Sequence, residues 1–317
     1  MKYLVTGGAG FIGSNITKEL IKRSEFVRVL DNFATGKREN IFEFKSNQNF
    51  ELIEGDLRSF HIVRDAVKGI DFVLHQGALP SVPRSINDPI TTNDVNILGT
   101  LNILEASKEF GVKRVVYASS SSVYGDSEIL PKKENMPVQP LSPYSLSKYA
   151  GERYCQIYYN IYGLETVSLR YFNVFGTNQD PTSQYSAVIP KFIKLMKDGK
   201  QPTIYGDGSQ SRDFTFVSNI VKANILACTA DRAAGQVFNI ACGESFTILQ
   251  LVEFINKILE KNIKPNFDKP RIGEVRHSQA DIEKATKILN YKAETNFKEG
   301  LIQLIKIRAN TKYKSFQ

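Results

Sequence analysis

The sequence predicts an α/β fold in which a doubly wound, mostly parallel sheet is followed by a smaller C-terminal α/β unit. Three observations predict it. An apolar run at the N-terminus stops at closely spaced glycines, apolar runs then alternate with helical stretches, and this regularity loosens after Gly176. A length of 317 residues corresponds to two folding units of roughly 150 residues each. We therefore expect one domain over residues 1–175 and a second over residues 176–317, interleaved with the first at their boundary.

The first apolar run, residues 2–6, leads into Gly7, Gly10 and Gly13, after which a helical pattern begins. Glycines between a strand and a helix let the backbone approach a pyrophosphate at the helix N-terminus. The second apolar run ends at Asp31, 18 residues after Gly13, where a dinucleotide fold places the carboxylate that holds the adenosine ribose. Together these signals predict a Rossmann-like domain, and the acidic residue favours NAD over NADP.

Further apolar runs and helical stretches alternate along the first unit, and this alternation predicts ligand sites at the carboxyl ends of the strands. The expected strands are Phe26–Leu30, Glu51–Ile53, Asp71–His75, Arg114–Ala118 and Thr166–Tyr171, and the expected helices include Ser14–Ile21, Phe60–Lys68, Asn96–Phe110 and Ser145–Ile161. In the second unit we expect helices near 188–198, 247–261, 281–290 and 297–309, with short strands near 203–205 and 237–240.

A serine cluster, residues 119–122, follows the fifth strand, and Tyr144 and Lys148 come later at helical spacing. Side chains at i and i+4 share a helix face, so the Lys148 ammonium is expected beside the Tyr144 phenol. A cation at that range is expected to lower the phenol pKa from about 10 towards neutrality, where a general base works best. Such a pair is also common on helix surfaces, and only the glycine motif gives it a chemical interpretation.

Composition narrows the function further. Lys and Arg balance Asp and Glu over residues 1–190, so the whole net charge of +8 lies C-terminal and indicates either an anionic ligand or lysine-rich solvated helices. No basic run or aromatic RNA-binding motif indicates nucleic acid. No window is apolar enough for a membrane span. Three scattered cysteines and three scattered histidines predict neither disulfides nor a metal site, and we expect a cytoplasmic protein.

With these residues identified, the chain resembles the extended short-chain dehydrogenase/reductase family over essentially its whole length. The resemblance rests on TGGAGFIG, Asp31, the serines before VYGD, and SPYSLSK. Within that family it is most similar to nucleotide-sugar 4-epimerases acting on UDP-glucose or UDP-N-acetylglucosamine. That closer resemblance rests on LRYFNVFG at 169–176, AVIPKF at 187–192, YGDGSQSRDF at 205–214 and RIGEVRHSQAD at 271–281.

The resemblance implies roles for individual residues. Tyr144, Lys148 and Ser120 would be catalytic, although four consecutive serines leave the hydroxyl open by one position. The implied NAD-binding residues are Gly7, Gly10, Phe11, Ile12, Gly13, Asp31, Asn32, Asp56, Leu57, Gln76, Ala78, Asn96, Tyr144, Lys148 and Phe172. The implied UDP-sugar residues are Arg84, Ser120, Ser122, Tyr144, Asn173, Val188, Tyr205, Arg212, Arg271 and Ser278.

The resemblance also implies the reaction. Ionised Tyr144 would take the proton from the sugar 4-hydroxyl while a hydride passes to NAD, and the 4-keto sugar would turn over before the hydride returns. In the related epimerases a tyrosine at the position of Ser278 restricts the site to unacetylated sugars. The small Ser278 therefore predicts that N-acetylated sugars are accepted. The alternative is that Ser278 only occupies a turn before the next helix.

Other functions stay open on the sequence. Nucleotide-sugar dehydratases and decarboxylases of the family share the first oxidation, but dehydratases carry an acidic pair where this chain has Ser121 and Ser122. Non-catalytic dinucleotide sensors on this fold usually lack the tyrosine and lysine. Apolar residues on several faces of the helices near 96–110 and 145–161 predict a homodimer: Ile103, Leu104, Tyr154, Ile157 and Tyr158.

Overall fold

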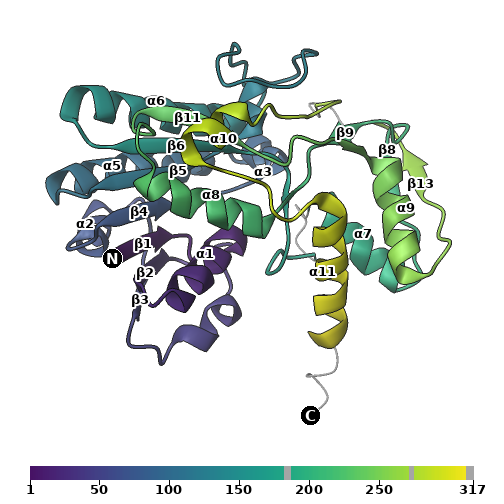
Figure 1. The fold of residues 1–317 in the computed structure, drawn as a ribbon, viewed down its shortest axis with the longest axis horizontal. Coiled ribbons are helices and arrows are strands. Elements are labelled where there is room, and N and C mark those ends of the chain that lie inside the picture. The colour runs from purple at the N-terminus through teal and green to yellow at the C-terminus, as the bar shows by residue number, and fades with distance from the viewer. Residues whose placement is uncertain (182–186, 271–274, 312–317) are drawn as a thin grey trace.

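The computed structural model describes residues 1–181, 187–270 and 275–311 (Figure 1). At its centre is a seven-stranded sheet in the order β11-β6-β5-β4-β1-β2-β3, and every neighbouring pair is parallel. This arrangement confirms the predicted doubly wound parallel sheet. The strands are β1 (Lys2–Thr6), β2 (Phe26–Asp31), β3 (Phe50–Glu54), β4 (Phe72–His75), β5 (Arg114–Ser120), β6 (Thr166–Tyr171) and β11 (Gln236–Ile240).

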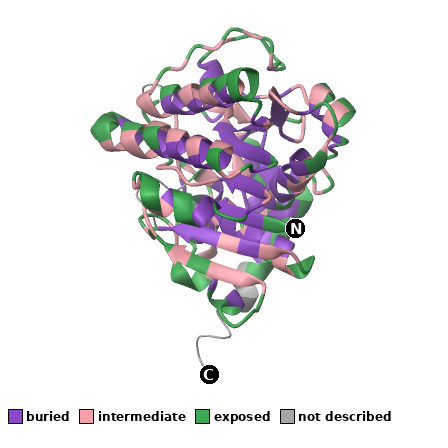
Figure 2. Ribbon diagram, turned by 90° about the vertical axis from the view of Figure 1, so that its left-hand side faces the viewer, coloured by how far each residue is buried: buried purple, intermediate pink, exposed green. Residues whose placement is uncertain are grey.

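Helices cover both faces of the sheet, because a parallel sheet is apolar on both sides. One face packs against α1 (Phe11–Lys22), α8 (Val217–Thr229) and α10 (Glu283–Leu289), and the other against α2 (Phe60–Val67), α5 (Gly99–Glu109) and α6 (Pro143–Tyr162). In Figure 2 the strands are purple over most of their length, whereas the helices mix buried with exposed residues. Each face thus has its own apolar core.

The helix that carries the tyrosine and the lysine has defined ends. Ser142 and Ser145 form a reciprocal capping box at the start of α6, with Pro143 in the first turn. Gly163 ends the helix in the left-handed conformation with φ of 70°. The start of α6 is therefore fixed next to the end of β5, where the serine cluster lies.

Shorter segments connect these elements. A π-helical turn (Asp94–Leu98) leads directly into α5. The other short helices are α3 (Val82–Asn87), α4 (Pro89–Asn93) and three 3-10 turns at Arg38–Asn40, Phe42–Phe44 and Ser121–Tyr124. Ser119 and Ser120 of the serine cluster end β5, and the last of these turns begins at Ser121.

The second unit lies beside the sheet, on the right in Figure 1, and has its own core of aromatic and aliphatic side chains centred on Phe297. It contains α7 (Val188–Lys197), α9 (Ile248–Leu259) and α11 (Phe297–Thr311). Its short strands pair as β7 (Val174–Phe175) with β10 (Thr215–Phe216), β8 (Thr203–Tyr205) with β13 (Asn266–Asp268), and β9 (Ser211–Arg212) with β12 (Phe246–Thr247).

The chain returns to the first unit between the parts of the second, because α8 and β11 join the large sheet and its core. The boundary at residue 175 stays a prediction. Among the described helices, none combines the length and the apolar composition needed to cross a membrane.

The residues on which the dimer was predicted require a correction. Ile103, Leu104 and Tyr158 are buried in the core between α5, α6 and the sheet, and Tyr154 packs against that core. Only Ile157 of the five is exposed. Sequence periodicity did not separate core from surface here, because α6 buries one side and leaves apolar residues exposed on the other.

Candidate active site

The glycine turn after β1 is tight enough that side chains are excluded. Gly7 has φ of 64°, and a Cβ there would lie 2.8 Å from the Gly77 Cα. A Cβ on Gly13 would lie 2.1 Å from the Gly7 carbonyl oxygen. Phe11 and Ile12 begin α1 immediately after Gly10, so the helix N-terminus opens onto this turn. The local backbone leaves room for a ligand that approaches α1 end-on.

Three predicted ribose and adenine residues lie together at the ends of β2 and β3. The Asp31 carboxylate accepts hydrogen bonds from the Ala9 and Phe33 amides at 2.9 and 2.8 Å, and burial raises its pKa. Asn32 donates to the Asp56 carboxylate at 2.9 Å. The pKa of Asp56 is lowered to about 2, mainly by its hydrogen bond with Arg58. Asp31 thus also fixes the glycine turn, through the Ala9 amide.

Other predicted cofactor residues hold the site together. The Gln76 amide bonds to Asn224 at 3.0 Å and accepts from the Tyr171 hydroxyl at 3.1 Å. The buried Asn96 bonds to both backbone groups of Leu79 and donates to Ser147 at 3.0 Å. The roles of these side chains towards NAD stay predictions.

Three further predicted cofactor residues differ in exposure. Leu57 is buried and Ala78 is half-buried. Phe172 is fully buried against Tyr124, and its amide donates to the Ile240 carbonyl at 3.1 Å. Their contacts with NAD also stay predictions.

The serine cluster and α6 meet as the sequence predicted. The Ser120 hydroxyl lies beside the Tyr144 phenol and lowers its pKa. Ser122 donates to the Ser120 hydroxyl twice, from its amide at 3.2 Å and from its own hydroxyl at 2.9 Å. Ser120 is therefore the serine placed against Tyr144, and we retain it as the candidate catalytic hydroxyl.

Lys148 differs from the expectation. Its Nζ donates to the Ala118 carbonyl at 2.7 Å and lies 5.2 Å from the Tyr117 ring centroid. Burial lowers the pKa of Lys148 to about 8, whereas burial raises the pKa of Tyr144 against the opposing effect of Ser120. The prediction that Lys148 brings the Tyr144 pKa near neutrality is thus wrong for this structure. Helical spacing places the two residues on one face but does not fix the direction of a long lysine side chain.

Four predicted substrate residues line one cavity of about 270 Å³ in the second unit, namely Asn173, Val188, Tyr205 and Arg212. Arg212 lies on β9 and donates to the carbonyls of Ser211 and Arg276 at 2.9 and 3.1 Å. Residues that the sequence analysis did not single out, including Lys191, Gln210 and Phe214, complete the wall. Two of them, Gln210 and Phe214, lie in the segment YGDGSQSRDF, which could have identified them as site residues.

Ser278 lies next to this cavity. Its hydroxyl is 3.4 Å from the Asn173 side-chain nitrogen, and it is 8% exposed. The Ser278 amide donates to the Ser211 carbonyl at 3.1 Å, and its own carbonyl accepts from Ser245 at 3.3 Å. Its backbone is therefore held on both sides. Arg271 lies outside the described residues.

Arg84 lies on α3, and its amide donates to the capping Ser81 hydroxyl at 3.3 Å. Ser81 has φ of 97°, a left-handed value that is costly for a serine and is often found at functional sites. The sequence did not predict a left-handed backbone at Ser81. Nothing in the residue types around Ser81 signals such a backbone.

The sequence profile of the NAD-dependent epimerase/dehydratase family matches residues 3–241. The chain belongs to this family. The matched range contains the glycine turn, the serine cluster, Tyr144 and Lys148. NAD is therefore its cofactor, and the two structural features that fit the cofactor are the glycine turn, which a Cβ would fill, and Asp31 at the end of β2.

Relatives within the NAD-dependent epimerase/dehydratase family differ in their sugars. A putative UDP-glucose 4-epimerase of Methanocaldococcus jannaschii is 40% identical over 95% of this chain and 96% of its own length. A UDP-glucuronate 4-epimerase of Thermodesulfobacterium geofontis is 34% identical over 94% of this chain and 93% of its own length. The solved UDP-N-acetylglucosamine 4-epimerase of Methanobrevibacter ruminantium, in complex with UDP-N-acetylmuramic acid, has a TM-score of 0.93 and 40% identity, with 98% of each chain covered.

Among the described residues, no three His, Cys, Asp or Glu side chains gather as metal ligands would. Each cysteine in that part of the chain is a free thiol.

Proposed function

We propose that this protein is an NAD-dependent UDP-sugar 4-epimerase that interconverts UDP-N-acetylglucosamine and UDP-N-acetylgalactosamine and also accepts UDP-glucose and UDP-galactose. The observation that carries the proposal is the placement of Tyr144 beside the Ser120 hydroxyl, one helical turn before the buried Lys148. The 40%-identical relatives named above as 4-epimerases support the reaction type.

In this mechanism Tyr144 accepts the proton of the 4-hydroxyl and returns it at the end of the cycle. Ser120 donates a hydrogen bond to the oxygen at carbon 4 as it gains carbonyl character. When bound, NAD would supply reversible hydride transfer at carbon 4 of the sugar. Lys148, with three N–H donors and only one bonded to Ala118, is available to hold the nicotinamide ribose.

The remaining predicted residues form two groups, which would contact different parts of the nucleotide sugar. Asn173, Val188, Tyr205 and Arg212, with Arg271, would hold the uridine diphosphate, and the cavity they line supports this. Arg84 and Ser122 would contact the sugar. A firm hold on the diphosphate leaves the sugar able to turn between its two orientations.

Ser278 is the basis for choosing acetylated sugars. It lies beside Asn173 with its backbone held on both sides, so a side chain larger than serine would extend into the neighbouring space. Filling a packed site in this way costs roughly 1–3 kcal/mol. A serine leaves that volume open and offers a hydrogen-bond partner to an acetamido group.

The proposal includes a cytoplasmic homodimer. Exposed apolar side chains support the dimer, since Leu146, Ile157 and Ile161 lie along α6 and Leu98 lies where the π-helical turn meets α5. Sedimentation velocity tests it, and a monomer at micromolar concentration would contradict it.

The test of function is incubation of the purified protein with each of the four UDP-sugars and chromatographic separation of the 4-epimers without added NAD. The proposal expects conversion in both directions for both pairs. A dehydrated or decarboxylated product would instead favour the corresponding alternative in the same family. Absence of any product with every sugar would favour a sensor.

A further inference from the structure

The end of β5 is joined to α6 by contacts at consecutive strand residues. The Ala118 carbonyl accepts a hydrogen bond from Lys148, and the Ser120 hydroxyl lies beside the Tyr144 phenol. Between them, the Ser119 hydroxyl donates to the Glu152 carboxylate. Tyr144, Lys148 and Glu152 are spaced four residues apart, so three successive turns of one helix face hold three successive residues of the strand.

Glu152 is held from behind by an arginine on the next strand. Arg170 of β6 donates to both Glu152 carboxylate oxygens, from Nε and Nη2, at 2.8 Å each. The side chains of Glu152 and Arg170 are 2% and 4% exposed. The Arg170 guanidinium also lies 4.7 Å from the centroid of the Tyr124 ring, just beyond the serine cluster. A bidentate pair with this support has little freedom to move.

The direction of Ser119 decides the direction of its neighbours. Successive side chains of a strand point to opposite faces, so a residue that turns over reverses the two beside it. The β5–β6 ladder, which pairs Ser119 with Arg170, directs the Ser119 side chain towards α6. The bond to Glu152 then ties this part of the strand to the helix and holds the Ser120 hydroxyl and the Ala118 carbonyl in their present places. The sequence analysis gave no role to Ser119, Glu152 or Arg170.

We propose that Glu152 is a positioning residue, whose carboxylate, held by Arg170, fixes Ser119 and thereby sets Ser120 against Tyr144 and Ala118 against Lys148. This inference rests on the proposed epimerase function. It assigns no contact between Glu152 and substrate or cofactor.

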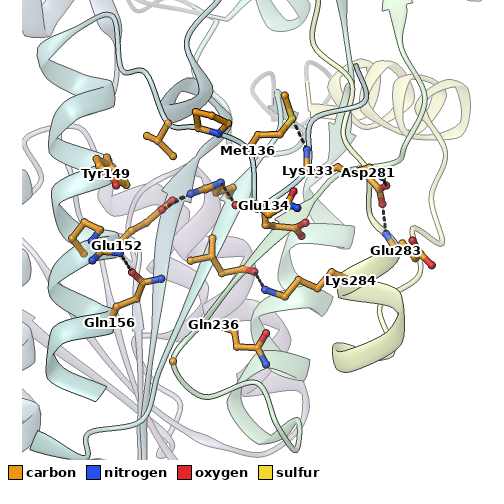
Figure 3. A pocket seen from close by; sticks show the side chains of 17 residues that line it. Lys133, Glu134, Met136, Tyr149, Glu152, Gln156, Gln236, Asp281, Glu283 and Lys284 are labelled. Carbon is orange, nitrogen blue, oxygen red and sulfur yellow. Dashed lines mark hydrogen bonds and ion pairs between the residues drawn. The ribbon is translucent and has the colours of Figure 1, made fainter. Parts of the chain in front are cut away.

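A cavity of about 700 Å³ lies on the far side of the ion pair, between α6, the segment 133–138 and α10 (Figure 3). Glu152 projects from α6 into its wall, and Arg170 also lines it. A small anion in solution therefore has a route to Arg170 that does not pass through the active site.

The main test is Ser119→Ala, which removes the contact but leaves the ion pair intact. We expect kcat for epimerisation to fall about ten- to hundredfold, the size of one hydrogen bond to a charged group, with the KM for UDP-sugar unchanged. The acid limb of the kcat–pH profile should move to higher pH, because the Ser120 hydroxyl lowers the Tyr144 pKa.

Other charged groups near this cluster stay the same in the Ser119 variant. They are Lys148 on α6, Arg170 on β6 and Glu152 itself. His75 on β4, with a pKa lowered to about 3 by burial and by Lys148, is neutral throughout the range. A moved limb therefore reports the phenol.

The matched control is Glu165→Gln. It removes the carboxylate partner of Arg114, whose Nε–Oε2 distance is 2.8 Å, at the opposite end of the same strand. Its kcat and pH profile should equal those of the wild type. The epimerase activity of the wild type tests the proposed function. The ratio of kcat in Ser119→Ala to kcat in the wild type tests the positioning role of Glu152. An unchanged kcat and pH profile in Ser119→Ala, with an active wild type, would overturn the inference.

Glu152→Ala provides a second test through the cavity. It leaves Arg170 without its carboxylate, and formate at tens of millimolar can take that place. Restoration of kcat by formate, at least severalfold above an equal concentration of chloride, is the expected result. Restoration of thermal stability without any recovery of kcat would show that the pair is only structural.

Discussion

Replacing Lys148 by methionine should make the NAD-free protein respond differently to pH. Lys148 is 5% exposed, and burial lowers its pKa from 10.5 to about 8. The folded state thus binds this proton less readily than the unfolded state. A basic group whose pKa is lower in the folded than in the unfolded state destabilises the fold at a pH below its folded-state pKa. The free energy of unfolding then rises as the pH increases towards the pKa of the unfolded state. Methionine has nearly the same length and no charge.

The magnitude follows from the shift. A change from 10.5 to about 8, at about 1.36 kcal/mol per unit, disfavours the folded state by about 3 kcal/mol at pH 7. At pH 9.5 most of the folded protein has already lost the proton, and about 1.5 kcal/mol remains. The variant also loses the hydrogen bond to Ala118, but that loss is the same at both pH values.

The assay is urea unfolding of both NAD-free proteins, followed by circular dichroism at pH 7 and pH 9.5. Between pH 7 and pH 9.5, the free energy of unfolding of the wild type should rise by about 2 kcal/mol relative to that of Lys148→Met. Lys287→Met is the control, because Glu283 raises the pKa of this exposed lysine and its proton stays on through the range. A difference that is independent of pH, or one of opposite sign, would refute the burial of a strained ammonium at this site.

Three other predictions follow from the site. Tyr144→Phe should lower kcat about 10²–10⁴-fold with bound NAD retained, because the ring fills its place without accepting a proton; near wild-type turnover would remove Tyr144 from the mechanism. Gly13→Ala should purify with little NAD, since its Cβ would lie 2.1 Å from the Gly7 carbonyl oxygen, whereas Gly10→Ala, at 3.1 Å, should lose less; equal NAD content in both would contradict the cradle. Ser278→Tyr should abolish only the acetylated reaction and Ser278→Ala should keep both, as measured by epimer separation; a parallel loss of both sugars in the tyrosine variant would refute the gatekeeper.

The sheet was predictable because parallel strands buried on both faces appear as continuous apolar runs, and β2 and β6 begin where those runs do. Helix α8 was not predicted. Its sequence, VSNIVKANILACT, contains β-branched residues and asparagines with weak helix propensity, and its stability comes from packing against α1 and the sheet. Local sequence carries little of that information.

The positions of the site residues along the chain were predictable, but the directions of their side chains were less so. Spacing and resemblance located Tyr144 and Ser120, which meet in the structure. The bond from Lys148 to Ala118 joins residues 30 positions apart and depends on a rotamer. The Glu152–Arg170 pair had a weak signal, an arginine inside an apolar strand, which requires a buried partner.

The central claim, epimerisation at carbon 4 with return of the same hydride, is tested most directly with UDP-N-acetylglucosamine carrying deuterium at that carbon. Purified protein without added NAD should form UDP-N-acetylgalactosamine, and mass spectrometry should find the deuterium retained at carbon 4. Loss of the label to solvent would contradict the account. So would NADH that accumulates in proportion to an oxidised sugar, because the cofactor would then not be regenerated within each turnover.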